Sequence, residues 1–285
     1  MLRFKKKSTR RLFTDILFYI FALLFLIFFL LPLWTLVVGG FSSLDSVLTG
    51  KSILFPNPFS WNWPSLVSQQ SNPTPLRHLL NSFIISGAVV PLIFFSALTA
   101  YGLGRFKGPG QNIVFFAIMS TMMLPFTVTM IPRFIMFKSF GWNNTYIPFY
   151  VPAICGSAPA VFLLRQFMKT VPMDIEAAAR IDGAGHFRIF GQIMIPICKP
   201  ALITTFIFAV VGQWNDFMTP LILLNTHSKF PITLAIMTLK ADGDKLIHWH
   251  NIMLEAVLAT VPLVILFFIL QKYIVKGFIT SGVKG

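Results

Sequence analysis

Three polar residues suited to binding a hydroxyl-rich solute lie inside a long apolar stretch near residue 215. Gln213, Asn215 and Asp216 place two amides and a carboxylate beside the flat ring of Trp214. Polar groups within an apolar membrane segment are costly unless they face other helices or water, so they are first candidates for function. We predict that they line a translocation path, and a role in hydrogen bonding between helices remains equally open.

A second group of side chains has the chemistry of a metal site but lacks its spacing. His248 and His250 form an HxH pair, and Asp242 and Asp244 precede them in the same polar stretch. A zinc site needs a third or fourth spaced ligand, which this stretch does not supply. We therefore favour a solvated loop and predict no metal site.

The sequence also lacks an arrangement of residues that could catalyse a reaction. The sequence has no nucleophile paired with a base, no paired catalytic carboxylates and no GxxxxGK[ST] loop for nucleotide phosphates. We expect a chain that is not an enzyme and holds no cofactor. Any ATP and Mg²⁺ used in its work would be bound by another chain.

The elements that must position these residues are membrane helices. Of 285 residues, 55% are hydrophobic and only 11% are charged, and a helix needs roughly 20 apolar residues to cross a bilayer. The sequence predicts an all-α polytopic protein with six transmembrane helices, at about 15–38, 81–104, 111–132, 145–165, 201–224 and 251–271. The first of these is too long for a signal peptide and lacks a small-residue cleavage site, so we expect an anchor.

Basic residues set the expected orientation. Of the 23 Lys and Arg, 16 fall on one side of the predicted spans, which the positive-inside rule assigns to the cytoplasm. We expect a cytoplasmic amino terminus (1–14), extracytoplasmic loops (39–77 and 225–250) and a cytoplasmic tail (275–285). This distribution explains the net charge of +14 without nucleic-acid binding.

The long cytoplasmic segment 172–200 is predicted to be folded. Pro172 suits a first helical turn, where the carboxylates of Asp174 and Glu176 favour the positive end of the helix dipole. Gly183 can end that helix, and a second amphipathic helix is expected from about His186 to Ile195. From the residues alone, an amphipathic hairpin lying on the membrane surface is the alternative.

The same segment carries a motif. The run EAAARIDGAGHFRIFGQIMIPICKPAL, from Glu176 to Leu202, resembles the EAA loop in permease subunits of ABC importers. The similarity extends over 77–285. The runs NTYIPFYVP, FLLRQF and QWNDFMTPLILL are similar to the oligosaccharide-uptake branch, and the carboxyl end QKYIVKGFITSGVKG is similar to the shorter permease of maltose-type importers. Asp216, where many relatives have Glu, and Arg133, where most have an apolar residue, depart from the pattern.

The resemblance implies a fold, a function, partners and a location in the plasma membrane of a bacterium. It implies the type I ABC importer permease fold, with the family domain at 78–274, and a chain that imports a sugar, expected to be an oligosaccharide, by alternating access. The expected partners are a homologous second permease, two ATP-binding subunits, an extracytoplasmic solute-binding protein, which the loop 225–250 would contact, and membrane lipid. The longer permease is expected to make most of the sugar contacts.

The resemblance also assigns roles to residues. The coupling to the ATPase falls on five residues of the EAA loop: Glu176, Ala177, Ala178, Asp182 and Gly183. The alternative function is an ion-coupled secondary transporter that uses Asp216 or Glu255 as its carboxylate. The absence of an internal repeat weakens that alternative.

Overall fold

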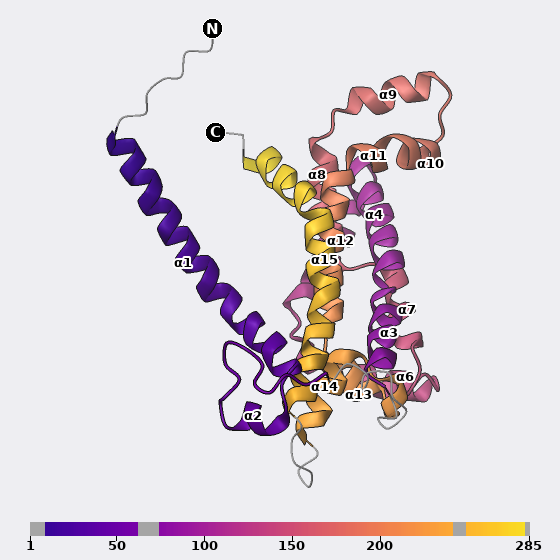
Figure 1. The fold of residues 1–285 in the computed structure, drawn as a ribbon. Helices are drawn as coiled ribbons and strands as arrows, with labels where there is room; N and C mark the ends of the chain where they lie inside the picture. The colour runs from indigo at the N-terminus through magenta and orange to yellow at the C-terminus, as the bar shows by residue number, and fades with distance from the viewer. Residues whose placement is uncertain (1–8, 62–73, 242–248, 283–285) are drawn as a thin grey trace. The chain divides into compact units, whose positions relative to one another are not determined.

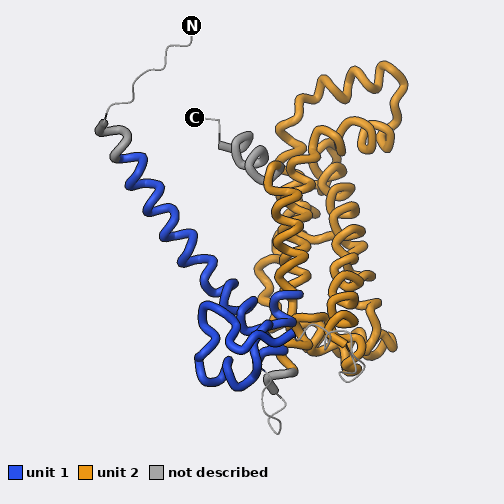
Figure 2. Tube along the Cα trace, viewed as in Figure 1, with its two compact units in different colours: residues 1–68, 239–258 blue, residues 69–238, 259–285 orange. Residues whose placement is uncertain are grey.

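The computed structural model describes residues 9–61, 74–241 and 249–282, and these residues are almost entirely helical. Within them, the extended pairing is limited to one isolated bridge between Ser42 and Phe59. The chain divides into two compact units, 1–68 with 239–258 and 69–238 with 259–285 (Figure 2). The all-α fold class is confirmed.

The first unit contains the long apolar helix α1 (Thr9–Gly40), the short α2 (Leu44–Leu48) and the start of α15 (Trp249–Gly282). Its candidate membrane span, Thr14–Gly40, reaches a mean hydropathy of 2.9, and its most apolar stretch has no residue buried within the chain, so lipid or another protein must cover that stretch. Glycines at the end of α1 allow close contact with α15. A Cβ on Gly39 would meet the sulfur of Met253, and one on Gly40 would meet Leu254.

The core of the second unit forms around α3 (Pro75–Ser86), α4 (Val89–Arg105), α8 (Ala158–Thr170) and α12 (Lys199–Trp214). Small residues bring α4 against the segment before α8. Gly156 has φ +72°, and a Cβ there would lie 2.8 Å from the hydroxyl oxygen of Ser96. That hydroxyl accepts a hydrogen bond from the amide of Ser157 at 2.9 Å.

Three predicted spans are interrupted. The third consists of α5 (Gln111–Ser120), η2 (Thr121–Met123) and α6 (Phe126–Ser139), with a 100° bend before α6. The bend falls within the predicted span 111–132, because Pro125 has no N–H to continue the hydrogen-bond ladder and holds Leu124 in an extended conformation. The fourth consists of α7 (Ile147–Tyr150), η3 (Pro152–Cys155) and α8, and the fifth of α12 and α13 (Met218–Leu223).

By length and composition, four helices are able to cross a membrane among the described residues, or up to six if each bent pair is one span. In Figure 1 the loop helices α9 (Met173–Ile181) and α10 (His186–Ile189) project from one end of the second unit. Helices α6 and α13 lie at its opposite end. The remaining elements are the π-helical η4 (Phe190–Met194), α11 (Ile195–Ile197), η5 (His227–Lys229) and α14 (Ile232–Ala241).

Candidate functional site: the loop 172–200 and the polar break in the fifth span

The loop 172–200 folds as two helical segments joined at a glycine, as the sequence predicts. Helix α9 starts directly after Pro172 and carries two acidic residues in its first turn. Gly183 (φ +79°) ends it, where the amide of Ala184 donates to the carbonyl of Ala179 at 2.9 Å. The second segment continues past the predicted end at Pro196 as far as Ile197, because Pro196 occupies the first turn of a new short helix, α11.

Apolar packing holds the second segment against α4 and α8. Ile189 and Met194 are fully buried beside Leu164 and Met168 of α8. The ring of Tyr101 in α4 lies 5.2 Å from that of Phe190. The base of the loop is therefore part of the core of the second unit, and its amphipathic face is used within the chain.

Glu176 points into the chain and is 3% exposed. Its carboxylate forms an ion pair with the guanidinium of Arg105, the last residue of α4. The structure therefore places Glu176 away from the exposed side of α9. The partner Arg105 was missed by sequence reasoning, although a charged residue at the end of an apolar run was a signal for it.

The other four predicted coupling residues are exposed on the opposite side of the loop: Ala177, Ala178, Asp182 and Gly183. Two large apolar side chains of the same loop are also exposed, Ile181 at the end of α9 by 87% and Phe187 in α10 by 82%. We call these six residues the coupling surface. Exposed apolar side chains of this size beside small Ala residues are typical of a helix that lies in a partner's groove.

The polar residues of the predicted path are not assembled into one cluster. Trp214 is buried, and its indole N–H donates to the carbonyl of Ala259 at 3.1 Å. The amide of Asn215 donates back to the carbonyl of Val211 at 2.9 Å. The carboxylate of Asp216 accepts from the amide of Thr219 at 3.1 Å, at the start of α13, and Gln213 is half-buried.

These contacts show why polar residues stand at this point of the fifth span. The helix breaks at 215–217, which frees backbone groups that need partners. Asp216 supplies a partner for one of them, the amide of Thr219. The side chain of Asn215 adds a second hydrogen bond to the Val211 carbonyl, which already accepts from the backbone amide of Asn215. The predicted contact of Gln213, Asn215 and Asp216 with a solute remains a prediction.

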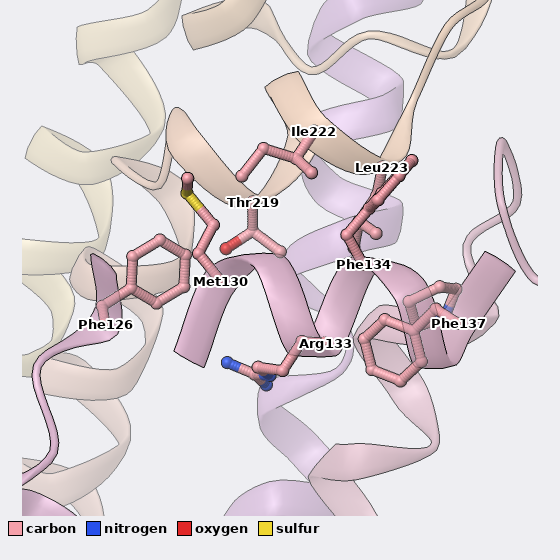
Figure 3. A pocket seen from close by; sticks show the side chains of 9 residues that line it. Phe126, Met130, Arg133, Phe134, Phe137, Thr219, Ile222 and Leu223 are labelled. Atoms are coloured by element: carbon pink, nitrogen blue, oxygen red, sulfur yellow. The ribbon is translucent and has the colours of Figure 1, made fainter. Parts of the chain in front are cut away.

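A small pocket lies beside this break, between α6 and α13 (Figure 3). Its lining is mostly apolar: Phe126, Met130, Arg133, Phe134, Phe137, Pro148, Thr219, Ile222 and Leu223. The side chain of Met130 reaches toward Thr219, whereas the guanidinium of Arg133 lies on the side of α6 away from Thr219 (Figure 3). Arg133 is exposed, so the edge of the pocket carries one positively charged side chain.

A buried hydrogen-bond network holds the opposite end of the second unit. Asn81 is fully buried, and its amide donates to the carbonyls of Ser228 at 2.8 Å and Phe230 at 3.0 Å. The hydroxyl of Tyr146 donates to the side-chain oxygen of Asn81 at 3.0 Å. The start of the predicted loop 225–250 is thus fixed to α3 and to the segment before α7.

Of the residues considered for a metal site, Asp242, Asp244 and His248 lie outside the described residues. Among the residues that are described, no group of three His, Cys, Asp or Glu is placed to hold a metal ion.

Comparison with known families decides what kind of chain this is. The family model described as the inner membrane component of binding-protein-dependent transport systems matches residues 73–280, well over half of the sequence. The chain belongs to this permease family. Membership makes it a multi-pass inner-membrane transport subunit, and it gives no support to the alternative of an ion-coupled secondary transporter.

Individual permeases of this family match over nearly the whole length. The sn-glycerol-3-phosphate transport system permease protein UgpE of Yersinia pestis is 30% identical, with 94% of this chain and 96% of the relative covered. The polygalacturonan/rhamnogalacturonan transport system permease protein YtcP of Bacillus subtilis is 30% identical, with 95% and 98% covered. The arabinooligosaccharides transport system permease protein AraQ of Halalkalibacterium halodurans is 33% identical over 72% of this chain and 73% of the relative.

Solved structures support the same fold for this permease. A bacterial ABC transporter involved in the import of the acidic polysaccharide alginate matches with a TM-score of 0.81 at 21% identity, covering 95% of this chain and 99% of that chain. A second chain, from the alginate ABC transporter in complex with an alginate pentasaccharide-bound periplasmic protein, matches with a TM-score of 0.61 at 16% identity, covering 92% and 96%. The type I ABC importer permease fold is confirmed.

Proposed function

We propose that this permease is the shorter of two membrane subunits in an ATP-driven importer of a carbohydrate, with oligosaccharides as the expected class. Two ATP-binding subunits supply the energy, and an extracytoplasmic binding protein delivers the solute. The related permeases named for arabinooligosaccharides and for polygalacturonan support the substrate class. The solved alginate transporter with a periplasmic protein bound supports the binding protein as a partner.

The observation that carries this proposal is the coupling surface. It combines small side chains, a glycine with positive φ and two apolar side chains more than 80% exposed, on a loop whose other face is packed into the core. A surface of this kind fits a groove in a partner protein. The charge distribution along the sequence supports a cytoplasmic position for this loop and for both termini, where ATP-binding subunits are found.

A bulky residue at the coupling surface should uncouple the transporter. We expect Ala178→Trp to reduce solute-stimulated ATP hydrolysis and uptake at least about tenfold, because an indole would hold the loop out of the groove. The measurement is ATP hydrolysis and uptake by the complex purified from native membranes, together with the amount of ATP-binding subunit that co-purifies.

The control is Lys169→Trp, which adds the same indole to an exposed position on α8, outside the coupling surface. It should leave both activities near the wild-type level. Normal uptake by Ala178→Trp at a normal membrane level would refute the coupling role of the loop.

A further inference from the structure

Arg105 is a buried cation at the junction of three segments. It ends α4 and is 6% exposed. Its Nε donates to the carboxylate of Glu176 in the first turn of α9. Its Nη1 donates to the carbonyls of Met168 at 3.1 Å and Val171 at 2.8 Å, and its Nη2 to that of Pro172 at 3.4 Å.

The chemistry of the guanidinium makes this junction stiff. Its N–H donors lie in one plane with fixed directions, so four acceptors at once leave it little rotational freedom. Two of those acceptors, the carbonyls of Met168 and Val171, lie at the end of α8, where the usual i to i−4 hydrogen bonds of the helix stop. Because the paired side chains are only 3% and 4% exposed, water does not compete for these bonds.

The last turn of α4 is itself held firmly. The carbonyl of Leu103 accepts from the Nε of Arg165 at 2.9 Å, and the guanidinium of Arg165 lies 3.8 Å from the ring centroid of Phe115. A Cβ on Gly104 would contact Arg165 at 3.6 Å. A force applied at Arg105 therefore acts on α4, α5 and α8 together.

We propose that Arg105 is a positioning residue that transmits movement of the coupling surface to the second membrane span, through its ion pair with Glu176. The inference rests on the proposed function, because it requires an ATP-binding partner on the coupling surface. Along the chain, α9 follows α8 through the short linker at Val171 and Pro172, and α4 is far away in sequence. The Arg105–Glu176 pair joins α9 directly to α4, on the side of α9 opposite the coupling surface.

The test uses the complete transporter with the variants Arg105→Gln, Glu176→Gln and the double variant. Each removes the ion pair but leaves the coupling surface intact. We expect the ATP-binding subunits to co-purify at wild-type levels and ATP hydrolysis to stay within about twofold of wild type, while uptake falls at least about tenfold. Solute imported per ATP hydrolysed separates this result from a simple loss of folded protein.

Two comparisons sharpen the test. Arg180→Gln is the matched control, because Arg180 is 51% exposed and lies 4.0 Å from the other carboxylate oxygen of Glu176 without joining α9 to α4. It should keep the wild-type ratio of uptake to hydrolysis. The double variant leaves no unpaired buried charge, so it remains informative even if a single variant does not fold. Because both changes break the same link, the double variant should take up no less solute than the single variant with the lower uptake, provided that this single variant folds.

Three results would overturn the proposal. Wild-type uptake by the double variant would mean that the pair only balances charge. Losses that multiply in the double variant would mean that the two residues act separately. Release of the ATP-binding subunits by Glu176→Gln, but not by Arg105→Gln, would mean that Glu176 contacts the partner. None of these depends on Ala178→Trp, whose normal uptake would refute the proposed function instead.

Discussion

Gly156 shows how one residue can set the distance between two membrane segments. It lies between η3 and α8 with φ +72°, and its missing side chain leaves room for the hydroxyl and amide of Ser96 at 2.8 and 3.1 Å from the ideal Cβ position. Both the backbone conformation and the contact require glycine. The Ser96 hydroxyl then accepts from the amide of Ser157, the residue whose side chain caps α8.

Gly156→Ala should therefore destabilise the protein by about 1–3 kcal/mol, from backbone strain and from the clash with Ser96. The measurement is thermal unfolding of the detergent-purified chain. Gly141→Ala is the matched control, since Gly141 has φ +70° but no atom within 4 Å of its Cβ position. A melting temperature for Gly156→Ala equal to that of Gly141→Ala would show that contact with Ser96 contributes nothing.

At the scale of elements, the breaks in the third and fifth spans explain what sequence reasoning could and could not reach. Hydropathy identifies apolar runs long enough to cross a membrane, but it does not reveal where the helix within such a run breaks or bends. A proline inside an apolar run, such as Pro125, predicts a kink, yet a 100° bend depends on Leu124 being extended and on α6 packing against α13. The break after Trp214 carries no proline at all, and only its Asn and Asp side chains signalled it.

The loop 172–200 was predicted more closely because its signals are local. Proline, acidic residues, alanines and a glycine fix the helix, the turn and the second helix within a few residues of one another. The inward orientation of Glu176 depends on Arg105, which is 71 residues away in sequence. No local pattern could predict that contact.

Asp216 gives a prediction at this scale, because its contact is with the backbone at the start of α13. Asp216→Ala should destabilise α13 by about 1 kcal/mol through loss of the capping acceptor, whereas Asp216→Asn keeps an acceptor oxygen and should have a much smaller effect. Thermal unfolding and uptake should be measured for both variants. If Asp216→Asn unfolds normally but has lost uptake, the charge itself is needed in the path and capping is a minor role.

At the scale of the whole molecule, the asymmetric placement of basic residues predicts the orientation in the membrane. Lys107 lies on the exposed loop that follows α4, and His227 lies on η5, beside residues whose carbonyls bind Asn81 of α3, the helix before α4. In a Cys155→Ser background, a membrane-impermeant maleimide should label Lys107→Cys only in inverted vesicles and His227→Cys only in intact spheroplasts. The remaining Cys198 is buried. The reverse pattern would place both termini outside and refute the assignment of the coupling surface to the cytoplasm.

The proposal that ATP hydrolysis by other chains drives this permease can be tested directly by uptake in proteoliposomes. The complete complex is reconstituted with its binding protein on one side and ATP on the side of the coupling surface. We predict uptake that requires both ATP and the binding protein, that is unchanged by a proton or sodium ionophore, and that falls to background in Ala178→Trp. Uptake by this chain alone, without ATP and collapsed by an ionophore, would contradict the account.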